Sequence, residues 1–187
     1  MKEIKQGFMI FILFSILTGL IYPAFVTVVA QIIWKDKANG SLIKIDGKVI
    51  GSKLIGQKFT GSKYFYGRPS AVDYKGSISG ASNLGPTSKK LFETVEQEIK
   101  KVRAENNLPA NAKIPGDLVL SSASGLDPHI SLESAYLQAS RVAQARGISL
   151  DEVKKLIMKN TDKPQFNFLG QRRVNILALN LELDKAS

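Results

Sequence analysis

The first pattern along the chain is a long apolar stretch near its start. Residues 8–34 contain no charged side chain. As a helix rising ~1.5 Å per residue they would span ~40 Å, more than the hydrocarbon core of a bilayer requires. Pro23 lies in the middle of the stretch, and Trp34 lies at its far end, where aromatic side chains anchor membrane helices. We therefore predict a tail over residues 1–7, a transmembrane helix over residues 8–34 and one soluble domain over residues 35–187.

Two other interpretations of the apolar stretch stay open, and so does its orientation. A cleaved signal peptide has an apolar region of only about 7–15 residues and a small-residue cleavage site, which residues 28–30 match poorly. A buried core helix is the second alternative. Basic residues lie on both sides of the stretch, at Lys2 and Lys5 before it and at Lys35 and Lys37 after it. The positive-inside rule therefore does not decide which end is cytoplasmic.

Three further segments have the pattern of helices. The first covers residues 87–106, and its apolar positions recur every three or four residues: Phe92, Val95, Ile99 and Val102. The second, residues 131–147, begins with a Ser that can cap it and stops at a Gly. The third, residues 149–160, opens with Ser-Leu-Asp-Glu, a capping box in which the Ser and Glu side chains each accept from the other residue's backbone N–H.

Four segments have the composition of strands: residues 42–50, 64–66, 118–120 and 174–183. The last of them alternates partly between apolar and polar residues, as a half-buried strand does. Strands at both ends of the soluble domain, with helices between them, predict the α+β class. The expected architecture is one N-terminal transmembrane helix followed by a single soluble domain of mixed short strands and about three helices.

Composition narrows the possible chemistry. The chain has 26 Lys and Arg against 16 Asp and Glu, one His and no Cys. Without Cys there is no disulfide, thiol nucleophile or iron–sulfur cluster, and one His cannot form a site that needs two imidazoles. The net charge of +10 suits an anionic partner, but basic residues occur in pairs rather than runs. We expect no nucleic-acid partner and no metal site, and we keep an anion-binding module as an alternative function.

Residues 51–58 nearly match a phosphate-binding P-loop. Gln57 stands where a Lys should reach the phosphates, and Lys58 stands where Ser or Thr should hold magnesium. An aromatic run follows instead of a helix, so no helix N-terminus would face a phosphate. We interpret the segment as turns between short strands.

A second motif suggests hydrolysis. Ser124, Asp127 and His129 lie within six positions, and triad order varies between folds. A membrane-anchored extracytoplasmic serine hydrolase, using Ser124 or Ser121 as nucleophile, is therefore an alternative function. Three residues of one loop rarely converge on one reacting atom, so the other interpretation is a structured turn in which His129 is hydrogen-bonded. The nearby stretch 76–80 resembles a nucleophile elbow but has Ile where the Ser should be.

Two polar loops, residues 66–71 and 79–86, contain many turn residues and few apolar ones. Ordering such loops costs backbone entropy, so we expect them either to pack internally through Arg68 and Asn83 or to press against a partner. The residues singled out for ordering these loops or contacting a partner are Arg68, Pro69, Ser70, Ser82, Asn83, Asp127 and His129.

Several short motifs follow one another in a specific order. They are Leu54-Ile55-Gly56-Gln57-Lys58-Phe59, Arg68-Pro69-Ser70-Ala71, Ser79-Gly80-Ala81-Ser82-Asn83-Leu84-Gly85-Pro86, Ser124-Gly125-Leu126-Asp127-Pro128-His129-Ile130-Ser131 and Arg173-Val174-Asn175-Ile176-Leu177. With the single N-terminal span, this order resembles the KdpC family, the small subunits of the Kdp potassium-transporting P-type ATPase. The resemblance covers the whole chain.

The resemblance implies a membrane complex with three other kinds of subunit: a P-type ATPase, a channel-like potassium-translocating subunit and a small membrane peptide. It implies a non-catalytic accessory subunit that supports assembly and stability, and also a catalytic chaperone that raises ATP affinity. ATP and potassium would be handled by the partner subunits, and no cofactor would be bound by this chain. The implied location is the bacterial cytoplasmic (inner) membrane, crossed once, with the N-terminus cytoplasmic and the C-terminal domain extracytoplasmic.

These implications have physical consequences. An extracytoplasmic domain cannot touch cytoplasmic nucleotide, so an effect on ATP would pass through the membrane subunits as a coupling free energy. Gln57 is the candidate if nucleotide is contacted directly. The span is expected to pack against partner helices through Ser15, Thr18 and Gly19, small residues that allow close approach, and near Pro23. The basic residues are expected to face lipid or solvent rather than the potassium path.

Overall fold

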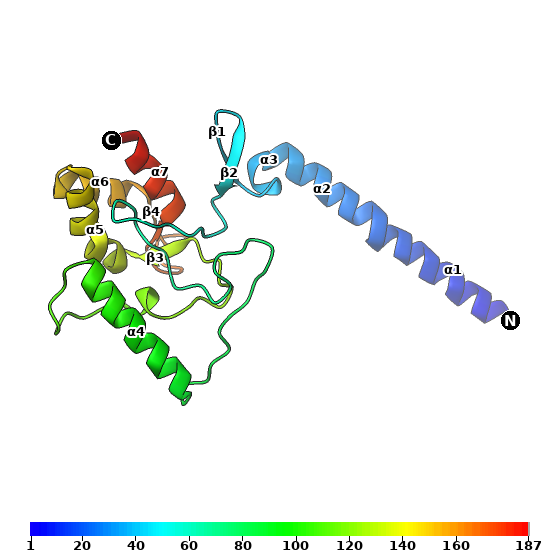
Figure 1. The fold of residues 1–187 in the computed structure, drawn as a ribbon. Helices are drawn as coiled ribbons and strands as arrows, with labels where there is room; N and C mark the ends of the chain where they lie inside the picture. The colour runs from blue at the N-terminus through cyan, green and yellow to red at the C-terminus, as the bar shows by residue number, and fades with distance from the viewer. Residues whose placement is uncertain (187) are drawn as a thin grey trace. The chain divides into compact units, whose positions relative to one another are not determined.

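A computed structural model describes residues 1–186, which fall into two compact units (Figure 1). The first unit, residues 1–52, contains helices α1 (Lys2–Ile16), α2 (Tyr22–Ile33) and α3 (Lys35–Ala38) and strands β1 (Leu42–Ile45) and β2 (Lys48–Ser52). The second unit begins at Lys53. Its elements are α4 (Lys89–Glu105), β3 (His129–Ser131), α5 (Leu132–Arg146), α6 (Leu150–Lys159), β4 (Thr161–Asp162), β5 (Arg173–Asn175) and α7 (Ile176–Ala186).

The apolar stretch forms a continuous helix over Lys2–Ile33, long and apolar enough to cross a membrane (Figure 1). A π-helical turn, Leu17–Ile21, joins α1 to α2 just ahead of Pro23. A proline ring clashes with the carbonyl four residues earlier in a regular helix, and the wider turn relieves that clash without ending the helix. None of the helix's best membrane window is buried within the chain, which argues against the core-helix interpretation.

Residues 42–50, predicted as one strand, instead belong to a hairpin. β1 and β2 pair antiparallel, with a register shift after Ile43. The turn between them is Asp46-Gly47, and both residues have positive φ, 48° and 77°. Two-residue hairpin turns of this kind need φ above zero at both positions, and Asp-Gly satisfies that requirement. The single-strand prediction was wrong because it passed over this turn signal.

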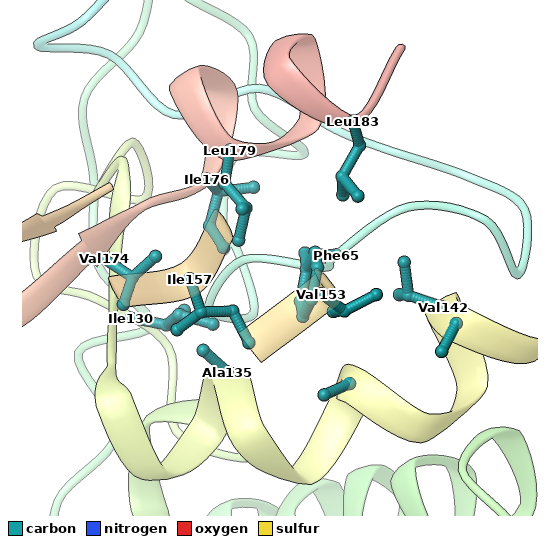
Figure 2. Packing of buried hydrophobic residues seen from close by; sticks show 12 residues of the cluster. Phe65, Ile130, Ala135, Val142, Val153, Ile157, Val174, Ile176, Leu179 and Leu183 are labelled. Atoms are coloured by element: carbon teal, nitrogen blue, oxygen red, sulfur yellow. The ribbon is translucent and has the colours of Figure 1, made fainter. Parts of the chain in front are cut away.

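In the second unit a small antiparallel sheet of order β3-β5-β4 is covered by helices α5, α6 and α7. Their buried side chains converge around Phe65, which is fully buried although it belongs to no helix or strand (Figure 2). The predicted caps are present. Ser131 Oγ accepts from Ser134 N at 3.1 Å, and Ser149 and Glu152 form the reciprocal capping box of α6. The α+β class is confirmed.

The segment 174–183, predicted as a strand, is β5 followed by helix α7. Asn175 Oδ1 accepts from Ala178 N at 3.0 Å and caps the helix. The buried positions recur at helical spacing: Ile176, Leu179, Asn180 and Leu183. The strand prediction was wrong because partial alternation also fits one helix face, and Leu, Ala and Glu favour helices.

Three smaller expectations were also wrong. Residues 64–66 are not a strand, and residues 118–120 overlap the 3-10 turn Gly116–Leu118. Phe92 is 65% exposed, although its helical stripe should bury it. The rest of that stripe does pack: Val95 and Ile99 lie against a second apolar cluster that contains Val102.

Candidate functional site

The irregular segment 53–88 lies against residues 120–128, and together these two stretches form what we call the loop cluster. Backbone N–H groups of Gly56 and Gly80 donate to carbonyl oxygens of the 120–128 stretch at 2.8 and 2.9 Å. The Ser70 hydroxyl donates to another carbonyl of that stretch at 2.6 Å. The polar loops predicted from the sequence are therefore ordered, at least in part, by contacts within the chain.

Two glycines make this close approach possible. A Cβ on Gly56 would lie 2.5 Å from the Asp127 carbonyl oxygen. A Cβ on Gly125 would lie 2.6 Å from a Val72 methyl and 2.8 Å from the Gly80 carbonyl oxygen, and Gly125 also has φ +68°. No other residue type fits either position without displacing backbone or a packed side chain.

Arg68 bridges the two stretches of the loop cluster. Its Nη1 lies 3.2 Å from Asp127 Oδ2, and its Nη2 lies 3.4 Å from the Ser121 carbonyl oxygen. Both side chains of the ion pair are 28% exposed. The Tyr74 hydroxyl donates to the Arg68 carbonyl. Arg68 Nε is buried and finds no hydrogen-bond acceptor among the described residues, so the guanidinium is only partly satisfied.

The environment of Arg68 shifts the ionisation of two neighbours. Burial works to raise the pKa of Asp127, but hydrogen bonds from His129 and from Arg68 outweigh it and hold that pKa below its usual range. Burial, assisted by the Asp127 charge, raises the pKa of Tyr74 to about 12. At neutral pH the cluster therefore contains a carboxylate, a guanidinium and a neutral phenol.

His129 lies between two carboxylates. Its Nδ1 is 3.6 Å from Asp127 Oδ1, and its Nε2 is 3.6 Å from Asp162 Oδ2. Asn175 Nδ2 is 3.5 Å from the same Nε2 and donates to the Lys53 carbonyl at 2.8 Å. The imidazole thus joins the loop cluster to the sheet.

This arrangement does not assemble a serine nucleophile. The contacts recorded for the His129 ring across residues 1–186 are with Asp127, Asp162 and Asn175, and none is with a serine hydroxyl. Ser124 Oγ accepts from Leu126 N at 3.1 Å and so stabilises a turn. The geometry therefore gives the hydrolase alternative no support.

Gln57 does not lie in a phosphate cradle. It is half-buried in coil, and the neighbouring Gly56 N–H, which a P-loop would direct at phosphate, already donates to Leu126 O at 2.8 Å. Of the other singled-out residues, Pro69 is half-buried, whereas Ser82 and Asn83 are exposed. Asn83 has φ +53°, a turn conformation that Asn tolerates.

A cavity of about 430 Å³ opens between the loop cluster and α4. Its charged lining is largely paired: Lys58 Nζ lies 2.6 Å from Asp73 Oδ1, and Lys101 Nζ lies 3.6 Å from Glu98 Oε2. Within residues 1–186 there is no cluster of three His, Cys, Asp or Glu side chains that could hold a metal ion. We assign the cavity no ligand.

Four side chains that order the aromatic run 64–66 were missed. Asn180 exchanges two hydrogen bonds with the Phe65 backbone, at 2.9 and 3.0 Å, and Gln138 does the same with the backbone of the next residue. Arg141 Nη1 donates to the carbonyls of Ser62 and Tyr64. Arg146 Nε donates to the carbonyl of Lys63 at 2.7 Å.

Side-chain amides thus take the place of a neighbouring strand in holding this run. The signal available in the sequence was the position of these polar residues on the otherwise apolar faces of α5 and α7. Gln138 and Asn180 are almost fully buried, and Arg141 is 8% exposed. Polar groups buried this deeply need specific partners.

Comparison with known proteins gives a consistent result along the whole chain. Residues 4–185 match the family described as KdpC: K+-transporting ATPase, c chain. The chain is 48% identical over 186 residues to the potassium-transporting ATPase KdpC subunit of Mycobacterium bovis (strain BCG / Pasteur 1173P2), covering 98% of both proteins. It is 48% identical to the KdpC subunit of Geotalea uraniireducens, with all of both chains covered. For the KdpC subunit of Bradyrhizobium diazoefficiens the identity is 45%, covering all of this chain and 98% of that one.

Proposed function

The chain belongs to the KdpC family of potassium-transporting ATPase subunits, and on that premise we propose that it is a non-catalytic accessory subunit that supports assembly and stability of the complex. The observation that carries the proposal is the extent of the match, which includes both the apolar helix and the loop cluster. Its partners are the other subunits of the Kdp ATPase: the P-type ATPase, the channel-like potassium-translocating subunit and the small membrane peptide.

The helix Lys2–Ile33 is the proposed membrane anchor. Within residues 1–186 none of its most apolar window is buried, so these side chains need lipid or other helices around them. We propose that the helix crosses the cytoplasmic membrane of a bacterium, with its N-terminus in the cytoplasm and residues 35–187 outside. A helix that remains in the membrane fits an integral subunit, whereas a cleaved leader does not.

One face of that helix is the proposed contact with partner helices. Around Gly19 the space beside the helix is open: apart from adjoining residues and the helix's own backbone, no atom of residues 1–186 lies within 4 Å of where a Cβ would be. The Thr18 hydroxyl donates to the Phe14 carbonyl at 2.7 Å, so its hydrogen bond is satisfied without a partner. Together with Ser15 and the π-helical turn before Pro23, these residues offer a shallow surface that a neighbouring backbone can approach closely.

The loop cluster is the proposed docking surface of the second unit. It is ordered within the chain, yet the side chains of Arg68 and Asp127 remain 28% exposed. Ser82 and Asn83 are exposed beside it. A preformed loop surface with partly exposed charged groups can bind a partner without a large ordering cost.

Any effect on ATP affinity is proposed to be indirect. The Gly56 N–H beside Gln57 donates to the Leu126 carbonyl at 2.8 Å and is therefore not free for a phosphate. A domain outside the membrane would act on cytoplasmic nucleotide only through the membrane subunits, as a coupling of about 1–3 kcal/mol between sites. Titration of ATP against the complex with and without this subunit measures that coupling.

The test of the accessory role is co-purification. Tagged full-length chain is expressed with the other subunits and isolated in mild detergent, and the recovered proteins are identified by mass spectrometry. Recovery of the P-type ATPase and the channel-like subunit is the expected result. Recovery of this chain alone, while the other subunits are demonstrably folded in the same membranes, would contradict the proposal.

The docking surface is tested by Arg68→Ala in the same assay. We expect a lower yield of partner subunits and slower potassium uptake, because the substitution removes a partly exposed guanidinium and its bridge to Asp127. Lys75→Ala is the matched control, since Lys75 is an exposed basic residue of the same loop. Equal partner recovery by the two variants would show that Arg68 is not part of the docking surface.

A further inference from the structure

The loop between β4 and β5 ends in a tight, apolar tip. Gln165 and Leu169 exchange two backbone hydrogen bonds, both 2.9 Å, which close a small hairpin. Phe166, Asn167 and Gly170 all have positive φ, at 52°, 67° and 93°. The tip therefore has a defined backbone rather than that of an extended coil. We call residues 163–173 the aromatic finger.

The finger exposes large apolar side chains. Phe166 is 81% exposed, Phe168 is 74% exposed and Leu169 is 50% exposed. The two rings lie 6.4 Å apart, so they form one small apolar surface. Single exposed apolar residues are common, but two phenylalanines and a leucine on one constrained tip mark a surface that is covered in the working protein.

The flanks of the finger are basic. Lys163 precedes the tip, and Arg172 and Arg173 follow it; all three are exposed. The nearest acidic residue in sequence is Asp162, whose Oδ2 lies 3.5 Å from Arg173 Nε and 3.6 Å from the His129 ring. The finger itself contains these three basic residues and no acidic one, although Arg172 and Arg173 also line a pocket with Asp117, Asp127 and Glu133.

We propose that the aromatic finger dips into the headgroup region of an anionic phospholipid bilayer, the same bilayer that holds the chain's own apolar helix. Aromatic and leucine side chains favour the membrane interface, and each nearby Lys or Arg adds about 1 kcal/mol of attraction to anionic lipid. An exposed apolar tip with basic residues on both sides suits an anionic lipid surface. This inference depends on the proposed membrane anchoring but not on the identity of the partner subunits.

The tether makes weak lipid binding effective. Because the second unit is covalently joined to a helix that we place in the membrane, the finger meets the bilayer at a high effective concentration. Two anchoring signals of modest strength then act together, as they do when a lipid chain is combined with a basic patch. The finger would limit how far the second unit moves away from the membrane surface.

The test uses tryptophan fluorescence of the full-length chain. Trp34 is the only tryptophan, so Trp34→Phe gives a silent background, to which Phe168→Trp adds a reporter at the tip. The protein is reconstituted into vesicles of equal parts phosphatidylcholine and phosphatidylglycerol, with and without brominated acyl chains. We expect tip emission to shift to shorter wavelength and to be quenched by the brominated lipid.

A matched reporter and a charge variant sharpen the test. Phe92→Trp in the same background reports on another exposed phenylalanine, on α4 and outside the finger, and its emission should stay unquenched. Arg172→Gln should lower the ratio of membrane-docked to undocked tip about fivefold, since one basic residue contributes about 1 kcal/mol to the attraction for anionic lipid. Pure phosphatidylcholine vesicles should weaken docking in the same direction.

Two outcomes would overturn the proposal. One is tip emission that is unshifted and unquenched in anionic vesicles. The other is emission that shifts only when the partner subunits are reconstituted with the chain, which would make the finger a protein-binding surface. Co-purification of the partners with the Phe168→Trp chain is measured in parallel, so failure of lipid docking is distinguished from failure of the accessory role.

Discussion

The inner stretch, residues 62–66, and the outer loop, residues 67–86, belong to one irregular segment but are ordered by different means. The inner stretch is held by side chains of α5 and α7, and its central residue, Phe65, is fully buried. The outer loop is held by the 120–128 stretch through backbone contacts and the Arg68–Asp127 pair. One half is attached to the helical core, whereas the other is attached only to another loop.

The difference shows in two arginines. Arg141 is 8% exposed and donates to the Asn106 side chain, to two backbone carbonyls of the inner stretch and to Gln138, while its guanidinium stacks 4.2 Å from the Tyr66 ring centroid. Arg68 is more exposed and keeps one nitrogen without an acceptor among the described residues. The first arginine completes a core, and the second is partly exposed at the proposed docking surface. We expect the inner stretch to govern stability and the outer loop to govern docking.

The largest expected effect comes from breaking the inner half with Arg141→Ala. Loss of the guanidinium leaves several buried acceptors unpaired, and we expect a loss of about 3 kcal/mol in the free energy of unfolding. Denaturant unfolding of the detergent-solubilised chain, followed by circular dichroism, measures it. Arg172→Ala, which removes an exposed arginine, should change stability little. Similar losses for both variants would refute the conclusion that Arg141 holds the inner stretch.

A smaller effect is expected when the outer half is broken at Gly125. In Gly125→Ala the added methyl meets the Gly80 carbonyl and a Val72 methyl, and the residue keeps an unfavourable φ of +68°, so we expect a loss of about 2 kcal/mol. Gly147→Ala is the matched control, because it has φ +67° but no atom near the new methyl. Limited proteolysis should cut the outer loop faster only in the first variant. Equal cleavage would mean that the close approach does not order the loop.

The smallest effect is the pH dependence of the outer half. Burial works to raise the folded-state pKa of Asp127, but hydrogen bonds from His129 and Arg68 hold it below its usual range. The ionised carboxylate therefore stabilises the folded chain at pH values above its unfolded pKa of about 4. That stabilisation is lost as the pH falls through the lower pKa of the folded state. Asp127→Asn should flatten this acid limb in unfolding measurements. Asp73→Asn is the control: the pKa of Asp73 is also lowered, but by a hydrogen bond and ion pair with Lys58 in which both side chains are largely exposed. If Asp127→Asn leaves the loss of stability at low pH unchanged, that loss comes from other groups than Asp127.

Sequence patterns predicted the parts of this fold that depend on neighbouring residues. The apolar run before Trp34, the cap at Ser131 and the capping box at Ser149 are local, and the structure contains each of them. The strand expected at residues 174–183 failed because local alternation did not distinguish a strand from one face of a helix. The Asn175 cap, a local signal, would have separated the two.

The candidate site was less predictable because its geometry depends on residues far apart in the chain. Arg68 could be selected from a polar, turn-rich loop, but its contact with Asp127 crosses 59 positions. The roles of Gln138 and Asn180 could not be read locally, since a polar residue on an apolar helix face does not reveal which backbone it will bind. Phe166 and Phe168 were not singled out, because two aromatic residues in a short run fit a core as well as an exposed tip.

The side-chain amides that hold the inner stretch also set the order in which the domain can be completed. The backbone N–H of Tyr66 donates to Gln138, which is synthesised 72 positions later. That of Phe65 donates to Asn180, 115 positions later and close to the end of the chain. Contacts so distant in sequence close large loops and form slowly. A chain still being synthesised therefore has no finished core. The outer loop that we propose for docking continues directly from the inner stretch, so we expect only a full-length subunit to present it to its partners.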